Sequence, residues 1–203
     1  MARKSYHHGN LRQALVEASL VLIEEKGPLG FTLAEAARSA GVSAAAPYRH
    51  FKNREDLIAE VARQGFAAFG DRLEEAFDEA RPTPLAAFGA IGQVYLDFAR
   101  NDPGSYVAMF ESGVDISSDA ELATTAQRAM SVLVRAAERL SAHLPPAERP
   151  PATMVANHVW ALLHGIVELF TRGQPVGRVP YSAEEMLESG TGIYLRGLGL
   201  IPR

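Results

Sequence analysis

The chain has 203 residues, of which 47% are apolar, and it contains no cysteine. This length can bury a substantial core in one domain or two, and the lack of cysteine excludes disulfides and thiolate chemistry. No apolar run is long enough for a membrane span, and residues 1–12 lack a signal-peptide core, so we expect a cytoplasmic protein with no membrane partner. Alanine and leucine outnumber β-branched residues and no strand pattern occurs, which predicts an all-α fold of about nine helices.

The charge is unevenly distributed along the chain. The formal net charge is −4, but residues 1–54 contain eight Lys and Arg against four acidic residues, a local charge of +4. The remaining residues, 55–203, therefore carry −8. A basic head joined to an acidic body predicts a DNA-binding domain over residues 1–54 and a separate, non-DNA domain over 55–203.

The first nine residues are predicted to form a mobile arm. Arg3 and Lys4 in this arm are expected to contact phosphate or lie in a minor groove, although two solvated charges on a tail explain them equally well. Asn10 is expected to cap the first helix, which ends at Gly27 and Pro28. The buried stripe of this helix is predicted to consist of Leu11, Leu15, Ala18 and Leu22.

The next stretch has the pattern of a helix-turn-helix. Thr32 and Glu35 have capping-box spacing, so a helix is predicted to begin at Leu33. Gly41 stands where a left-handed helix end is needed, and Ser43 is positioned to cap a second short helix. Two short helices joined by a glycine-containing turn predict that the second helix enters a DNA major groove.

The second helix has small residues followed by hydrogen-bond donors. Ala44 and Ala45 would allow base edges to approach closely, and the later side chains can donate to phosphate. Pro47 removes the first intrahelical bond, to the Ser43 carbonyl, which predicts a later helix start. An ordinary helical hairpin with a solvated basic face remains an alternative. The predicted DNA-binding residues of this region are Thr32, Ser43, Ala44, Ala45, Tyr48, Arg49, His50 and Lys52.

This stretch resembles the DNA-binding signature of TetR-family transcriptional regulators, and residues 7–12 resemble the start of that family's first helix. The resemblance covers residues 7–65, and Pro47 departs from it where many members carry an aliphatic residue. It implies a homodimer that binds a palindromic operator in double-stranded DNA and responds to a small-molecule effector. The residues that carry the signature are Gly41, Val42, Ser43, Tyr48, Arg49, His50, Phe51, Lys52, Arg54, Glu55 and Leu57.

The rest of the chain is predicted to be helical. Asn53 and Asp56 have the spacing of a helix start, and this long helix ends at the proline-rich residues 82–84. It would belong to both domains and link them mechanically. Five further helices are expected, around residues 85–98, at 106–111, from Asp119 onward, at 152–172 and at 182–198.

Large, adaptable or amphipathic side chains in the body are candidates for an apolar effector pocket. Plain core packing is the alternative for each of them. The polar row Asn157, His164 and Glu168 needs partners, which are a ligand, water, another subunit or one another. Trp160, His164 and Gly165 also resemble the Trp-His-Gly motif of one branch of TetR-like regulators. The predicted effector-binding residues are Tyr95, Tyr106, Met109, Phe110, Met130, Trp160 and His164.

The last two helices are predicted to form the dimer interface. Gly190 and Gly197 would share one helix face, where small residues allow another helix to approach closely. A frayed C-terminal helix is the alternative. The predicted interface residues are Val167, Phe170, Gly190, Ile193, Tyr194 and Gly197.

We therefore expect a ligand-responsive transcriptional repressor that is released from DNA by a small apolar or amphipathic effector. An activator or co-regulator with the same DNA-binding head is the alternative, because the sequence does not distinguish repression from activation. An all-α enzyme is disfavoured, since the sequence shows no nucleophile–base pair, phosphate loop or metal cluster. No catalytic residue, metal or cofactor is expected.

Overall fold

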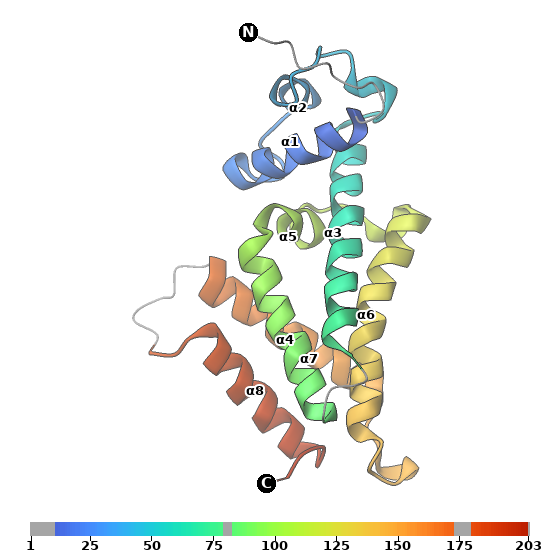
Figure 1. The fold of residues 1–203 in the computed structure, drawn as a ribbon, viewed down its shortest axis with the longest axis vertical. Coiled ribbons are helices and arrows are strands. Elements are labelled where there is room, and N and C mark those ends of the chain that lie inside the picture. The colour runs from blue at the N-terminus through green and yellow to red at the C-terminus, as the bar shows by residue number, and fades with distance from the viewer. Residues whose placement is uncertain (1–10, 79–82, 173–179, 203) are drawn as a thin grey trace. The chain divides into compact units, whose positions relative to one another are not determined.

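A computed structural model of the chain describes residues 11–78, 83–172 and 180–202 (Figure 1). The described residues form α-helices and shorter helical turns and contain no strand, which confirms the all-α prediction. Arg3, Lys4 and Asn10 lie outside the described residues. The α-helices are α1 (Leu11–Lys26), α2 (Leu33–Ser39), α3 (Arg54–Ala76), α4 (Pro84–Asn101), α5 (Pro103–Phe110), α6 (Ala120–Ser141), α7 (Ala152–Ile166) and α8 (Ala183–Gly197).

The chain forms two compact units. The described part of unit 1 consists of residues 11–66 and 102–124, and unit 2 contains the described residues of 67–101 and 125–203. Helix α3 begins in unit 1 and ends in unit 2. The described part of the predicted DNA-binding head belongs to unit 1, together with α5 and the first turn of α6. The two compact units are not divided at residue 54, so the predicted domain boundary there remains a prediction about which residues bind DNA.

Close packing of α1 against α5 is a main feature of unit 1. A Cβ added to Gly104 would lie 2.9 Å from the Leu20 carbonyl oxygen and 3.0 Å from Glu24 Oε1, so only glycine fits without a shift. The Gly104 amide donates to the Glu24 carboxylate at 3.2 Å. Glu24 thereby satisfies one of the free amides at the start of α5 and fixes α5 on α1.

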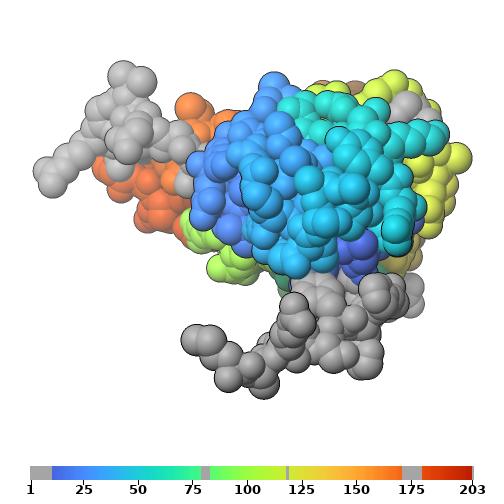
Figure 2. Space-filling view, turned by 90° about the horizontal axis from the view of Figure 1, so that it is seen from above, coloured from blue at the N-terminus to red at the C-terminus, as the bar shows by residue number. Residues whose placement is uncertain are grey.

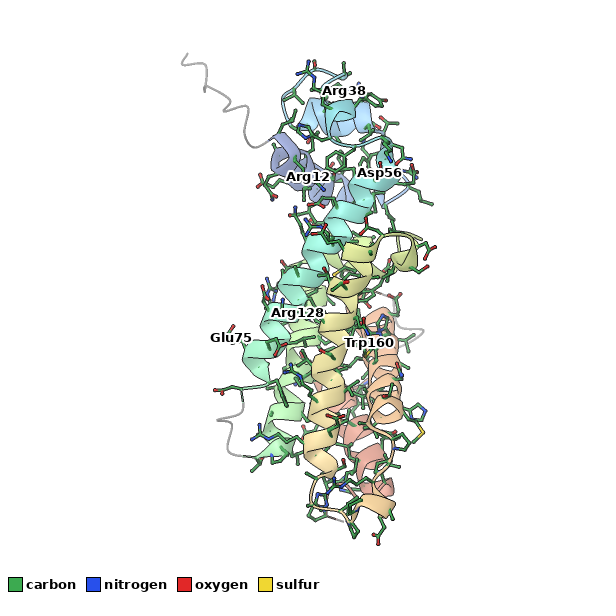
Figure 3. All side chains as sticks on the ribbon, turned by 90° about the vertical axis from the view of Figure 1, so that its right-hand side faces the viewer. Arg12, Arg38, Asp56, Glu75, Arg128 and Trp160 are labelled. Atoms are coloured by element: carbon green, nitrogen blue, oxygen red, sulfur yellow. The ribbon has the colours of Figure 1, made fainter. Side chains whose placement is uncertain are left out.

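Unit 2 is a helical bundle with an aromatic core. Helices α4 and α8 lie side by side and run antiparallel (Figure 1), and Arg100 near the end of α4 pairs with Glu184 at the start of α8. Arg128 of α6 lies beside α3 (Figure 3) and pairs with Asp71 at 2.8 Å. Phe69, Tyr95 and Phe98 are almost fully buried between these helices.

The local signals around α2 are confirmed in detail. Thr32 Oγ1 accepts from the Glu35 amide at 3.2 Å, and the Glu35 carboxylate accepts from the Thr32 amide at 2.8 Å, which completes the capping box. Gly41 has φ +72°, its amide donates to the Arg38 carbonyl, and the Val42 amide donates to the Ala37 carbonyl. This pair of bonds is a Schellman motif, which ends α2 through a left-handed residue.

The second helix of the predicted helix-turn-helix is shorter than expected. Ser43 does not cap an α-helix: residues 44–46 form a turn, and a single 3-10 turn follows at Pro47–Arg49. Pro47 has no N–H to donate to Ser43 and is buried at the start of this turn, which explains why regular helix is lost here. Eight α-helices therefore occur in the described residues, not nine.

Candidate nucleic-acid interface and effector site

The predicted base-reading and phosphate-binding residues that the structure describes all belong to unit 1. Figure 2 shows one face of this unit, in which α1, α2 and the following turns form a continuous surface coloured blue to cyan. Tyr48 is the largest apolar contributor and is 62% exposed. All the other predicted DNA-binding residues within the described part are exposed as well: Thr32, Ser43, Ala44, Ala45, Arg49, His50 and Lys52.

Three of these residues line one shallow groove. Thr32, Tyr48 and Lys52 face a depression of about 400 Å³, whose floor includes Phe31 and Leu33. The sequence suggests that Lys52 and free amides at the start of α3 grip a phosphate together. The Lys52 amide is not free, because it donates to Asp56 Oδ2 at 3.0 Å. Its ammonium group stays exposed and is the group available to a phosphate.

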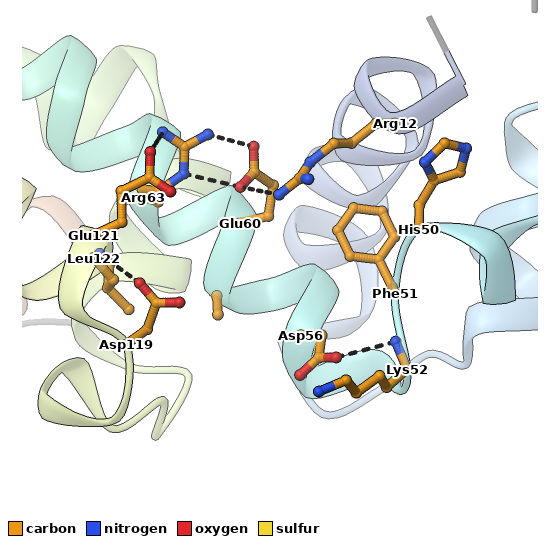
Figure 4. Close-up of a pocket in the computed structure, with 11 residues that line it drawn as sticks. Arg12, His50, Phe51, Lys52, Asp56, Glu60, Arg63, Asp119, Glu121 and Leu122 are labelled. Carbon is orange, nitrogen blue, oxygen red and sulfur yellow. Dashed lines mark hydrogen bonds and ion pairs between the residues drawn. The ribbon is translucent and has the colours of Figure 1, made fainter.

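A second, polar cavity of about 390 Å³ lies beside this face (Figure 4). At its wall the nearly buried Glu60 accepts from Arg12 at 2.8 Å and from Arg63 at 2.7 and 2.9 Å. Gln64 donates to the same carboxylate at 2.8 Å, and Arg63 also lies 3.4 Å from Glu121. The network joins the start of α1 to α3 and to the first turn of α6, all within unit 1.

Glu60 is ionised throughout the neutral range. Burial by itself would raise the pKa of the Glu60 carboxyl. Hydrogen bonds from Arg63, Gln64 and Arg12 outweigh this penalty and lower the pKa from 4.5 to about 2. Sequence reasoning missed this network, although the spacing of Glu60 and Arg63 on one helix is the signal that points to part of it.

The predicted effector-binding residues of unit 2 form an aromatic cluster. The Tyr95 hydroxyl lies 2.7 Å from His164 Nδ1, and the ring centroids of Tyr95 and Trp160 are 5.3 Å apart. Burial lowers the pKa of the His164 imidazole, which favours its neutral form. Phe69 also belongs to the cluster, and its ring centroid lies 5.5 Å from that of Tyr95. Met130, on α6, is half-buried in the same unit.

The remaining predicted effector-binding residues belong to unit 1. Tyr106 and Phe110 of α5 have ring centroids 5.0 Å apart, and Phe110 also meets Phe66 edge to face at 5.4 Å. A Cβ on Gly65 would lie 2.8 Å from the sulfur of Met109, so Met109 fills the space beside α3. The predicted set is therefore divided between two packed clusters, one in each unit.

The predicted dimer residues differ in their exposure. Val167 is fully buried, so its assignment to a surface is wrong: it follows α7 in a π-helical segment and packs inside unit 2. Gly190 lies against Leu162 of its own chain, where a Cβ would be 3.0 Å away. Phe170 and Tyr194 are half-buried, and Gly197 and Ile193 are exposed, the latter at 70%.

Further apolar side chains on α7 and the π-helical segment, missed in the sequence, are exposed. Met154 is 40% exposed and Leu169 is 61% exposed. His158, also exposed on α7, lies 2.8 Å from the Tyr194 hydroxyl of α8 and ties the two helices together. Residues 154, 158, 161, 165 and 169 are three or four positions apart and therefore share one helix face. This spacing is the sequence signal for the exposed side chains of Met154, His158 and Leu169.

Family models match both parts of the chain. Residues 15–61 match the model described as bacterial regulatory proteins, tetR family, and residues 88–192 match the tetracyclin repressor-like C-terminal domain. The chain belongs to the TetR family. It is thus a ligand-responsive, DNA-binding transcriptional regulator, from a family that is not enzymatic. None of the helices in the described residues combines the length and apolar character that crossing a bilayer requires.

A curated relative and two solved structures resemble this chain along most of its length. The HTH-type transcriptional regulator BetI of Brucella suis is 28% identical over 191 residues, which cover 92% of each chain. A solved structure of a protein with unknown function from Rhodococcus sp. RHA1 has a TM-score of 0.79 and 28% identity, with 96% of this chain and 98% of that chain covered. AibR, solved with isovaleryl coenzyme A and operator DNA, has a TM-score of 0.65 at 19% identity, over 90% of this chain and 96% of its own.

Proposed function

We propose that this TetR-family regulator is a cytoplasmic repressor that binds a palindromic operator as a homodimer and leaves it when an effector binds. The observation that carries the proposal is the exposed surface of unit 1. There, the small side chains of Ala44 and Ala45 stand in the turn directly before the exposed Tyr48, Arg49 and Lys52. Small residues beside phosphate-binding groups suit close approach to base edges.

We assign the two functions to different parts of the chain. We assign DNA binding to residues 1–54, with Arg3 and Lys4 as a minor-groove or phosphate arm, and effector binding and dimerisation to 55–203. An activator or co-regulator with the same head is the second candidate. It is supported by the same surface, because repression and activation differ in operator position and not in the protein's contacts.

We assign effector binding to the Tyr95, Trp160 and His164 cluster, with Met130 and the α5 residues Tyr106, Met109 and Phe110 as further candidates. The support is chemical: rings supply apolar surface, and the Tyr95–His164 pair supplies a polar anchor that a small amphipathic molecule can engage. Trp160, His164 and Gly165 also support membership of the Trp-His-Gly branch.

Fluorescence anisotropy on DNA from upstream of the protein's own gene tests the proposal. We expect tight binding that random competitor DNA does not abolish and that weakens steeply as salt rises. Equal binding to random DNA would contradict operator recognition on that fragment, and selection from a random DNA library would then identify the preferred site. No binding to either pool at low salt would overturn the proposal.

Dimerisation is assigned to the α7–α8 surface, where Leu169 and Ile193 expose apolar side chains. Ile193→Glu and Leu169→Glu should each shift the protein from dimer to monomer in analytical ultracentrifugation, because burying a carboxylate in an apolar interface is unfavourable. Leu29→Glu is the matched control, since Leu29 is 69% exposed in unit 1. An Ile193→Glu variant that remains as dimeric as the Leu29→Glu variant would contradict this interface.

A further inference from the structure

A groove between α4 and α8 in unit 2 is separate from the aromatic cluster. It has a volume of about 360 Å³, within the range of small-molecule sites. None of the predicted effector-binding residues lines it. Its lining is mostly apolar: Leu85, Phe88, Gly89, Leu187, Leu195 and Ile201.

The groove continues into the core of the unit. A smaller cavity of about 30 Å³ shares Phe88, Gly89 and Leu187 with the groove and is closed by the buried side chains of Leu133 and Val159. The lining from Leu85 to Gln93 spans about 12 Å of α4 at the rise of an α-helix. This shape suits an alkyl chain lying along the groove.

Gly89 is the second observation that points to a ligand. A glycine in the middle of a helix lowers helix stability, so it needs a structural reason. At Gly92, Gly104 and Gly190 that reason is internal, because an added Cβ would lie 3.0 Å or less from an atom of the same chain. Gly89, Gly165 and Gly197 have no such neighbour, and of these three only Gly89 lines the groove and the smaller cavity. A Cβ on Gly89 would meet no atom within 4 Å, and this glycine leaves open space in both cavities.

The polar groups lie at opposite ends of the groove. Because α4 and α8 are antiparallel, Arg196 lies toward the start of α4, and Glu188 lies toward Gln93. The Arg196 side chain folds back over Gly192, where an added Cβ would lie 3.2 Å from Nη1. No ion pair joins Arg196 to an acidic residue within the described parts of the chain.

We propose that this groove binds a small amphipathic monocarboxylate, with the alkyl chain over Gly89 and the carboxylate at Arg196. The cation provides charge complementarity for one anionic end. Glu188 at the other end repels a second negative charge, so a dicarboxylate of the same length binds more weakly. The apolar floor excludes short, fully hydrophilic acids because they gain nothing from burial there.

Isothermal titration calorimetry of the full chain with octanoate, in the absence of DNA, tests the site independently of operator recognition. Octanoate should bind with one site per chain, and the dicarboxylate suberate should bind more weakly. Gly89→Leu fills the groove and should weaken octanoate binding about 10-fold or more. Arg196→Gln should weaken octanoate about 2- to 5-fold and leave 1-octanol unaffected, since the alcohol carries no charge.

Matched controls distinguish the groove from other sites. Ala86→Leu places the same leucine side chain at an exposed position of α4 outside the groove, and Arg38→Gln removes the same charge in unit 1. Both should keep octanoate affinity within about 2-fold of the starting protein.

A further variant keeps the test decisive if Gly89→Leu does not fold. Gly89→Ala should raise the melting temperature while it weakens octanoate binding, a combination that structural damage does not produce. Absence of octanoate binding would overturn the proposal. So would octanoate affinity that is unchanged by both Gly89 variants.

Discussion

Lys52→Gln should weaken DNA binding about 10-fold or more at low salt, on operator and random DNA alike. We assign phosphate binding to the exposed Lys52, which shares a groove with Thr32 and Tyr48. Each lost phosphate contact lowers the slope of log affinity against log salt by about 0.9. Two copies in a dimer therefore reduce the slope by about 2, which anisotropy at several salt concentrations measures directly.

Arg196→Gln is the matched control for Lys52→Gln, because it removes one positive charge in unit 2. It should leave the salt slope unchanged. Ala44→Leu provides the contrast within the DNA-binding domain: bulk added at this exposed position, which we assign to base reading, should weaken operator binding while random-DNA binding and its salt slope stay the same. If Ala44→Leu and Lys52→Gln produced the same salt behaviour, the assignment of the reading surface would be wrong.

Glu60→Ala should lower the free energy of unfolding by about 2 to 3 kcal/mol at neutral pH. Removal of the nearly buried carboxylate leaves the Arg63 guanidinium, which is only 27% exposed, without its main partner. The Arg12 side chain is 55% exposed, so its guanidinium is hydrated in the variant, which limits the loss of stability. Urea unfolding followed by circular dichroism measures the difference between the variant and the starting protein.

The pH dependence of the stability of Glu60→Ala provides a second test. The Glu60 pKa falls from 4.5 to about 2 on folding, so its stabilisation is complete above pH 4.5 and is lost as the pH falls from 4.5 toward 2. The stability gap between the starting protein and Glu60→Ala should therefore narrow in this window. Glu55→Ala is the control, because its pair with Arg54 is exposed and should contribute at most about 0.5 kcal/mol. A gap that stayed constant down to pH 2 would show that packing, and not ionisation, explains the effect.

Signals that act within a few residues could be predicted from the sequence. The Thr32–Glu35 capping box, the left-handed Gly41, and the caps at Asn53 and Asp119 all occur where their spacing indicates. Each depends on hydrogen bonds across three to five residues, so no knowledge of the tertiary structure is needed.

Features that depend on distant partners could not be predicted. Arg12 and Glu60 are 48 residues apart, and nothing local links them. Val167 and Ile193 both lie on apolar helical segments, and which one faces the core depends on the neighbouring helices. Ser43 illustrates a conflict between two local rules, because its capping preference loses to the missing amide of Pro47.

The turn that precedes Pro47 has a consequence for how this regulator diverges from its relatives. Gly41 supplies the left-handed residue at one end of the segment and Pro47 fixes the backbone at the other, while Ala44 and Ala45 between them are exposed and lie outside the core and the α-helices. Substitutions at such positions change stability little. If Ala44 and Ala45 read bases as proposed, operator preference can therefore change through these two residues without destabilising the fold, and duplicated copies can acquire new DNA targets while they keep the same scaffold.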